Sequence, residues 1–261
     1  MRTSSASWKK GSRIWATSSC GSVSYTCMSP TETPSQVQDI GRDRFYPSLT
    51  NPNWLVLRKR RELFKCWLGG LPQQNLSVLD VGGRIQPYRC LLGDRCNRYV
   101  AVDLRTTPLV NVIAKGQQLP FGDASFDLVF CTQVLEYVAE PQLVVNEIHR
   151  TLKDGGFLLL SVPAVFPRDS DIEYWRFLPS ALGHLLSGFS HVDLASEGNS
   201  LTGLIRTLSV CLVTFARPPL LGKILSFTVV PVLNILGAFL EVLIPVNDDR
   251  FTANFSALAR K

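Results

Sequence analysis

Two acidic residues, each at the end of an apolar strand-like run, are the clearest candidates for chemistry. Asp80 precedes the glycine pair Gly82 and Gly83 in the stretch "VLDVGGRIQPYR", and Asp103 ends the next such run. Glycine lets the backbone turn sharply and approach a ligand closely. A carboxylate after a second strand can accept hydrogen bonds from both hydroxyls of a ribose. The two acids therefore predict a site for a ligand that contains a ribose.

The spacing of the glycines distinguishes between two classes of cofactor. A dinucleotide site would show G-x-G-x-x-G directly after the first strand. Here an acid precedes the glycines, and the later positions are Arg84, Gln86 and Arg89. No diphosphate cradle is evident, so a cofactor without phosphates fits better, and a nicotinamide oxidoreductase is the weaker interpretation.

Strand-like and helix-like segments alternate through the middle of the chain. Short, fully apolar runs separated by helices are typical of a mainly parallel sheet that is covered on both faces. Ligands of such sheets bind beyond the carboxyl ends of the strands, where the topology switches. The expected strands are 77–81, 98–104, 110–114, 126–131, 157–162, 191–196 and 254–260, and the expected helices are 53–68, 141–152 and 179–189.

Five segments in this order resemble the class I S-adenosylmethionine-dependent methyltransferases that act on small molecules. They are "VLDVGG" (78–83), "YVAVDL" (99–104), "QQLPFGDASFDLVFCTQVLEYV" (117–138), "EIHRTLKDGGFLLLSVP" (147–163) and "FSALARK" (255–261). The resemblance implies an α/β, Rossmann-like fold with a mostly parallel seven-stranded sheet and helices on both faces. It also implies an enzyme, with S-adenosyl-L-methionine as the cofactor.

The resemblance carries the family's cofactor contacts onto nine positions. Asp103 would bind the ribose, and Asp80 would act through the loop and the amino-acid end of the cofactor. The full set is Asp80, Gly82, Gly83, Asp103, Leu104, Gln118, Leu119, Thr132 and Gln133. Three positions depart from the family pattern: Arg84 replaces the second glycine of D-x-G-x-G, Lys115 replaces an acid, and Tyr137 replaces a histidine.

The segment 163–177 follows the fifth strand, where such an enzyme would hold its acceptor. It contains aromatic residues beside acids, a combination that suits the face and hydroxyls of a sugar. The substrate-binding candidates are Asp169, Tyr174, Trp175 and Arg176. The alternative is a surface loop tied by Asp–Arg pairs and anchored by Trp175 in the core. None of the three histidines has a convincing catalytic setting, so no catalytic residue is assigned.

The seven cysteines show no C-x-x-C pairing and no cluster with histidine. This pattern favours reduced thiols and a cytoplasmic location, and no metal site is expected. The net charge of +6 is spread out, apart from the run 58–61 in an expected helix. We expect that run to form a solvated helix face, with attraction to anionic lipid or substrate as the alternative. A nucleic-acid partner is not expected.

The stretch 200–248 is apolar and nearly uncharged, and it separates the last two expected strands. It predicts two helices, 201–215 and 220–243, split by Arg217-Pro218-Pro219. The second is long enough to span a bilayer, but Ser226, Asn234 and Glu241 recur along one face. Such a stripe favours an interfacial or substrate-lid hairpin. Packing in a dimer or in the core, and insertion across a membrane, are the alternatives.

These observations predict a domain organisation and a function. Residues 1–45 are expected to be a disordered or spurious extension, with a start at Met28 as a variant of that expectation. Residues 46–199 and 249–261 would form the methyltransferase domain, and 200–248 an inserted helical hairpin. The expected activity is methyl transfer to a small or lipid-linked acceptor, saccharide or quinone-like, at a membrane surface. The alternative is a non-catalytic scaffold of the same fold that binds a partner, a second copy included, through the hairpin.

Overall fold

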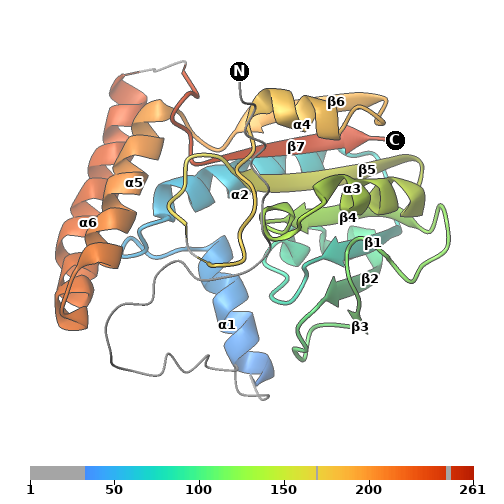
Figure 1. Ribbon diagram of the computed structural model, residues 1–261, viewed down its shortest axis with the longest axis horizontal. Coiled ribbons are helices and arrows are strands. Elements are labelled where there is room, and N and C mark those ends of the chain that lie inside the picture. Colours follow the sequence, from blue (N-terminus) through green and yellow to red (C-terminus); the bar gives the residue numbers. More distant parts are fainter. Residues whose placement is uncertain (1–32, 169, 245–247) are drawn as a thin grey trace, which may run out of the picture. The chain divides into compact units, whose positions relative to one another are not determined.

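The computed structural model describes residues 33–168, 170–244 and 248–261. A seven-stranded sheet with the order β3-β2-β1-β4-β5-β7-β6 forms its centre (Figure 1). The strands from β3 to β5 run parallel, and β7 runs antiparallel to both β5 and β6. The strands are β1 (Leu76–Val81), β2 (Cys96–Asp103), β3 (Val112–Ile113), β4 (Phe126–Thr132), β5 (Leu152–Pro163), β6 (His191–Ser196) and β7 (Asn254–Arg260). The fold class predicted from the sequence is confirmed.

Helices cover both faces of this sheet. Ile148 of α3 and Leu182 of α4 belong to the apolar core on one face. Phe64 and Leu68 of α2 belong to the core on the other face. Burying each large apolar side chain contributes about 1.5–3 kcal/mol, so the two cores hold the strands in place. The helices are α1 (Pro34–Phe45), α2 (Trp54–Gly70), α3 (Pro141–Thr151), α4 (Pro179–Leu185), α5 (Ser200–Phe215) and α6 (Pro219–Leu243).

Three single turns of 3-10 helix complete the elements. Two of them, η1 (Arg89–Leu91) and η2 (Gly93–Arg95), lie between β1 and β2, where no longer helix forms. The third, η3 (Leu135–Tyr137), follows β4. The connection from β1 to β2 is therefore compact, and the loop after β1 leads directly into short turns.

Residues 34–45 form a helix within the segment for which the sequence predicts a disordered or spurious extension. Thr33 and Gln36 make a capping box at the start of α1, and proline occupies its first turn. At the other end, Phe45 is buried against the ring of Tyr88, with 6.2 Å between the ring centroids. The signal for this helix was the T-P-x-Q pattern, although the apolar residues beyond it are few. Residues 1–32 lie outside the described part of the chain.

The apolar stretch forms two helices, α5 and α6, split at the prolines as predicted. They pack against each other and against α2 (Figure 1). Asn234 of α6 is buried and donates two hydrogen bonds, of 2.8 and 3.0 Å, to the carbonyls of Leu49 and Asn51. Glu241 forms ion pairs with Arg58 (2.6 Å) and Lys59 (2.9 Å) of α2. The polar stripe of α6 therefore faces the protein.

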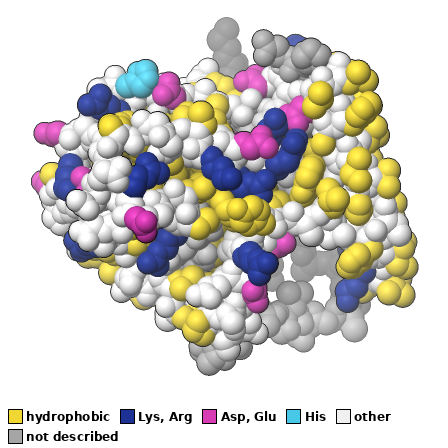
Figure 2. Space-filling model, turned by 180° about the vertical axis from the view of Figure 1, so that it is seen from behind, with side chains coloured by type: hydrophobic (Ala, Val, Ile, Leu, Met, Phe, Trp, Pro, Cys, Tyr) yellow, Lys and Arg dark blue, Asp and Glu magenta, His cyan; other side chains and the backbone are white. Residues whose placement is uncertain are grey.

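The opposite face of this hairpin is exposed and apolar. Figure 2 shows hydrophobic side chains gathered over the end of the molecule that α5 and α6 form. Among the described residues, α6 is the one helix that is long and apolar enough to cross a membrane, and only 17% of its most apolar window is buried. The large exposed side chains include Phe215, Leu220, Phe227, Val232, Phe239, Val242 and Leu243.

Candidate functional site

The carboxyl ends of β1, β2 and β4 lie side by side in the sheet. The chain leaves β1 toward β2 and β3 on one side, and β4 and β5 occupy the other side. The strand order thus reverses between β1 and β4, and this switch point is the expected position of a ligand. The predicted cofactor residues around Asp80, Asp103 and Thr132 end these three strands.

The loop after β1 depends on its two glycines. Gly82 has a φ of +79°, which is the left-handed region, and a Cβ there would collide with Cγ2 of Val134. A Cβ on Gly83 would lie 2.6 Å from Cγ of Asp80. The N–H groups of both glycines donate to the carbonyl of Val102, at 2.7 and 3.2 Å. Those two N–H groups are already used within the protein, so a bound anion would need other donors.

Arg84 occupies the position where the family pattern has a glycine. Its backbone lies outside the left-handed region. Its N–H donates to the carbonyl of Gly82 at 2.9 Å, and its own carbonyl accepts from Oγ1 of Thr107 at 3.0 Å. Thr107 therefore anchors the loop to the segment after β2. The backbone conformation does not require glycine at this position.

Asp80 is a buried carboxylate with one side-chain hydrogen bond. In that bond the phenol of Tyr99 donates to Oδ2 of Asp80 at 2.6 Å. Burial raises the pKa of Asp80 to about 7, the bond from Tyr99 acts to lower it, and the charge of Asp103 raises it further. The carboxyl of Asp103 is partly exposed and accepts from the N–H of Arg105 at 2.8 Å. The two acids are therefore close enough for their charges to interact.

The other predicted cofactor residues differ in how they face this site. Leu104 is 66% exposed, and Gln118 is exposed as well. Leu119 turns its side chain into the core, while its N–H donates to Oε2 of Glu147 at 2.8 Å. Its side chain therefore packs inside the protein, and its backbone is the part that remains for a cofactor contact. Gln133 has a φ of +55° and donates from Nε2 to Oγ of Ser161 at 3.2 Å.

A buried polar network lies behind Gln133, and the sequence did not predict it. Both oxygens of Glu197 accept from Nε of Arg60 at 2.8 Å. The same carboxylate accepts from Oγ of Ser161 at 2.6 Å and from Oγ of Ser256 at 2.5 Å. Burial acts to lower the pKa of Arg60, but Glu197 outweighs it and the pKa rises. The one sequence signal was an acid directly after the strand 191–196.

The basic run at 58–61 is not the solvated face that the sequence suggested. Arg60 is 2% exposed because Glu197 provides its partner inside the protein. Arg58 and Lys59 bind Glu241 of α6, and Arg61 stacks on Tyr46 at 4.9 Å. The acidic partners of Arg58, Lys59 and Arg60 lie more than a hundred residues away in the sequence, so no pattern within the run could reveal them.

Glu136, in η3 at the end of β4, is a second buried acid near the site. It is 2% exposed, and its Oε2 has no hydrogen-bond partner among the described residues. Burial raises its pKa to about 7, with Arg60 and Arg176 acting in the opposite direction and Glu173 in the same one. Its carbonyl accepts from the N–H of Tyr174 at 2.7 Å. This bond ties the acceptor segment to the end of β4.

The predicted acceptor residues lie along that segment. Tyr174 is 60% exposed and Trp175 is 43% exposed, so Trp175 is not a core anchor. Its Nε1 donates to the carbonyl of Val138 at 2.8 Å. Arg176 pairs with Glu173 at 2.8 Å and donates to the carbonyl of Phe166 at 3.3 Å. Asp169 lies outside the described residues.

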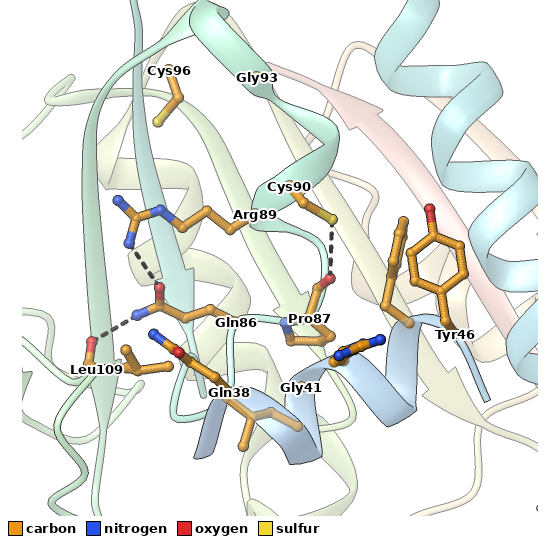
Figure 3. Close-up of a pocket in the computed structure, with 13 residues that line it drawn as sticks. Gln38, Gly41, Tyr46, Gln86, Pro87, Arg89, Cys90, Gly93, Cys96 and Leu109 are labelled. Atoms are coloured by element: carbon orange, nitrogen blue, oxygen red, sulfur yellow. Dashed lines mark hydrogen bonds between the residues drawn. The ribbon is translucent and has the colours of Figure 1, made fainter. Parts of the chain in front are cut away.

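A cleft of about 640 Å³ lies between α1 and the segment after the glycine loop (Figure 3). Gln86 joins its walls, since it donates to the carbonyl of Leu109 at 2.6 Å and accepts from Arg89 at 3.1 Å. None of the nine predicted cofactor residues lines this cleft, so it adjoins the site without containing it. Its lining residues include Gln38, Gly41, Arg42, Phe45, Ile85, Pro87, Cys90 and Cys96.

Arg44 of α1 is a charged residue near Arg84 that the sequence did not single out. It keeps contact with solvent, but the protein around it removes enough hydration to lower its pKa. The charges of Arg60 and Arg84 lower this pKa further, whereas Tyr88 raises it. Arg44 and Arg84 are therefore near enough for their charges to interact. No cluster of three or more potential metal ligands occurs within the described ranges.

Comparison with known proteins agrees with this geometry. Residues 79–160 match the model of a family described as a methyltransferase domain. Residues 79–160 thus resemble a domain of the class I methyltransferases. The matched range runs from β1 to β5 and includes the ends of β1, β2 and β4, where the site lies. S-adenosylmethionine is the cofactor of this class.

Relatives of the methyltransferase domain cover part of the chain. An uncharacterized methyltransferase of Mycolicibacterium gilvum is 31% identical over 46% of this chain and 50% of its own length. The malonyl-[acyl-carrier protein] O-methyltransferase 1 of Coxiella burnetii is 32% identical over 33% of each chain. The chain thus spans half or less of the length of these relatives. A chain in the complex between the Haloferax volcanii Trm112 methyltransferase activator and a methyltransferase has the same fold, with a TM-score of 0.50, 16% identity, and coverage of 84% of this chain and 96% of that one.

The residues at the rim fit S-adenosylmethionine. Asp103 has a partly exposed carboxylate, a group that can accept from ribose hydroxyls, and Asp80 has a buried carboxylate, a group that can pair with an ammonium. The loop after β1 does not offer the N–H groups of Gly82 and Gly83 to a diphosphate, because both donate to Val102. The donor set therefore suits a cofactor that carries a ribose and an amino acid and has no phosphate.

Proposed function

We propose that this chain transfers a methyl group from S-adenosylmethionine to a small or lipid-linked acceptor at the surface of a membrane. The observation that carries the proposal is the pairing of Asp80 and Asp103 at the switch point of a methyltransferase domain. Cofactor contacts are proposed for Asp80, Gly82, Gly83, Asp103, Leu104, Gln118, Thr132 and Gln133, and for the backbone of Leu119.

The protein's part in methyl transfer is mostly one of position. The reaction is an in-line displacement, so alignment and the local field lower the barrier. The bound cofactor supplies an electrophilic methyl group on a sulfonium. In this proposal Asp103 holds the ribose, and Asp80 faces the ammonium. Arg44 and Arg84 supply cations for the carboxylate, because the glycine N–H groups are occupied.

The acceptor would lie against the segment after β5. Tyr174 and Trp175 are exposed there, and aromatic faces can stack on a sugar or on a quinone-like ring. Arg176 donates to Glu173 and to the carbonyls of Phe166, Pro167 and Trp175, so the direction of its guanidinium is fixed. Tyr174, Trp175, Arg176 and Asp169 are the proposed acceptor residues.

The hairpin supports a membrane surface as the place of reaction. Its exposed face carries large apolar side chains such as Phe227 and Phe239, and soluble monomers rarely expose so many together. Asn234 and Glu241 hold its other face on the domain. Full insertion of α6 would break those bonds, so α6 lies in the interface and does not span the membrane. The five described cysteines are free thiols, which suits the cytoplasmic side.

Calorimetry with S-adenosylhomocysteine tests the cofactor part of the proposal. Saturable micromolar binding to the full chain is expected, and Asp103→Asn should weaken it about tenfold or more, the loss expected for a charge-assisted hydrogen bond. Asp193→Asn, at an exposed aspartate on β6, is the matched control and should bind as the wild type does. A folded chain without detectable binding would support the non-catalytic scaffold instead.

Sedimentation with lipid vesicles tests the membrane part. The full chain should sediment with vesicles of mixed phosphatidylcholine and phosphatidylglycerol. The double variant Phe227→Ser/Phe239→Ser should remain in the supernatant, because it removes apolar area from the exposed face. Leu143→Ser, at an exposed leucine on α3, is the control. Equal sedimentation of all three proteins, or none of the wild type, contradicts the membrane assignment; a dimer in the absence of lipid would point to self-association.

A further inference from the structure

Arg206, on α5, is a buried guanidinium without a carboxylate partner among the described residues. Its side chain is 1% exposed. Nε and Nη2 both donate to Oδ1 of Asn53, at 2.8 and 2.6 Å, and the group stacks on Phe166 at 3.8 Å from the ring centroid. Nη1 is buried without a hydrogen-bond partner. Burying an unpaired charge and leaving a donor unsatisfied are both costly, so this arrangement needs an explanation.

The two arginines whose charges act on Arg206 each have a carboxylate partner. Arg60 is bound to Glu197 and Arg176 to Glu173, so these two pairs are balanced. Arg206 is the arginine of the three that has no carboxylate partner among the described residues. Burial lowers its pKa to about 9, and the charge of Arg60 adds to that effect more than Glu197 opposes it. An anion beside Arg206 would balance the cluster.

We propose that Arg206 binds the anionic group, a phosphate or a carboxylate, of the methyl acceptor. The proposal rests on the function proposed above. A guanidinium presents its N–H groups in a planar fork that matches two oxygens of either anion, and Nη1 of Arg206 is the nitrogen whose N–H groups have no partner among the described residues. Arg206 is buried and Phe166 stacks on its guanidinium, so in this proposal the ring shifts to let the anion reach Nη1.

The surroundings connect this anion site to the proposed reaction site. Phe166 and Arg176 come from the segment that would hold the acceptor. The ring of Phe166 stacks on Arg206, and the guanidinium of Arg176 lies over the same ring. Glu197 is shared by Arg60 and Ser161, and Ser161 holds Gln133 at the end of β4. An acceptor bound at Arg206 therefore extends toward the ends of β4 and β5.

The same helix relates the anion site to the apolar surface. Arg206 faces inward on α5, while Leu204 and Leu208 on that helix are exposed. An amphiphile could place an apolar chain along the hairpin and its phosphate or carboxylate at Arg206. This favours a phosphate-linked lipid acceptor over a neutral quinone-like ring.

Binding of dodecyl phosphate and of inorganic phosphate to the full chain tests the proposal, with dodecyl maltoside as the uncharged probe. The wild type should bind dodecyl phosphate saturably and melt at a higher temperature in its presence. Arg206→Met should weaken that binding about tenfold or more and abolish the shift. Without ligand the same variant should melt no lower than the wild type, because it removes an uncompensated buried charge.

Arg98→Met is the matched control. Arg98 is also a guanidinium on a phenyl ring, 5.6 Å from the centroid of Phe126, but it is exposed and lies near the start of β2. It should leave phosphate binding unchanged. If Arg206→Met fails to fold, Arg206→Lys keeps the charge and loses the fork, and it should weaken binding in the same direction.

The outcomes separate the two sources of the anion. Much tighter binding of dodecyl phosphate than of inorganic phosphate supports a lipid-linked acceptor, and equal binding supports a soluble phosphate at the same site. No saturable phosphate binding by the wild type, or equal binding by wild type and both Arg206 variants, overturns the proposal. S-adenosylhomocysteine affinity is measured on the same samples: a chain that binds dodecyl phosphate and no cofactor would refute the methyltransferase function and leave the anion site standing.

Discussion

The phenol of Tyr99, on β2, donates a hydrogen bond of 2.6 Å to the buried carboxyl of Asp80, on β1. Burial raises the pKa of Asp80 to about 7, and this bond acts against that rise because it stabilises the ionised form. The charge state of Asp80 therefore changes close to neutral pH. A cofactor ammonium group would bind the ionised form, so affinity should depend on pH in the same range.

Tyr99→Phe should move that pH dependence upward. Without the phenol the carboxylate loses its stabilising donor, and the pKa of Asp80 rises above about 7. The affinity for S-adenosylhomocysteine should increase with pH in both proteins, with the midpoint of the variant higher by about one pH unit. Calorimetry from pH 5.5 to 9 measures it, with Tyr46→Phe at an exposed tyrosine as control. Identical midpoints would show that Asp80 does not govern binding.

Glu136→Gln should stabilise the protein at high pH. Burial raises the pKa of Glu136 from 4.5 to about 7. Between these two pH values the folded state keeps a proton that the unfolded state has already released. The stabilising contribution of the protonated acid is present below pH 4.5 and is lost as pH rises through 7. At pH 8 the wild type pays the cost of a buried carboxylate, which the amide avoids.

The expected gain in the free energy of unfolding is about 1–2 kcal/mol at pH 8, less than the pKa shift alone would give because a buried amide also needs partners. At pH 5 the two proteins should be nearly equal. Urea titrations at both pH values measure the difference. A gain of the same size at pH 5 would mean that charge is not the cause.

Gly203→Ala should weaken the packing of the hairpin on the sheet domain and lower the free energy of unfolding. A Cβ at this position of α5 would collide with the carbonyl oxygen of Phe251 and lie 3.2 Å from Cα of Thr252. Backbone atoms cannot move aside as a side chain can, so the loss should be about 1–3 kcal/mol. Gly183→Ala, in α4 with open space around it, should be neutral or stabilising by about 0.5–1 kcal/mol. Thermal melts of both variants measure the contrast; a loss of equal size in the two would refute the packing argument.

The strands and the switch point could be predicted from the sequence because their signals are local. The run that contains Asp80 is apolar and ends in glycines, and β7 occupies the predicted residues. The helices of the hairpin were predictable for the same reason, since their break is marked by consecutive prolines.

The buried network could not be predicted, because its members are brought together only by the fold. Arg60 lies within four consecutive basic residues, and nothing local distinguishes it from Lys59, which binds a different helix. Its partner Glu197 follows β6, the last strand in the sheet order. Leu119 shows a second limit of the sequence: a motif gives its position, but the burial of its side chain depends on the packing of the core.

Arg84→Gly restores the glycine of the family pattern, and it should weaken cofactor binding. The backbone at Arg84 is outside the left-handed region, so glycine brings no relief of strain. Its charge acts together with that of Arg44, and the glycine N–H groups that could otherwise bind a carboxylate are held by Val102. Loss of one partly exposed charge should lower the affinity for S-adenosylhomocysteine about three- to tenfold, and the loss should shrink at high salt. Arg84→Lys should recover most of the affinity. Calorimetry at low and high salt decides the sign: tighter binding by Arg84→Gly would mean that the arginine side chain fills the space of the cofactor.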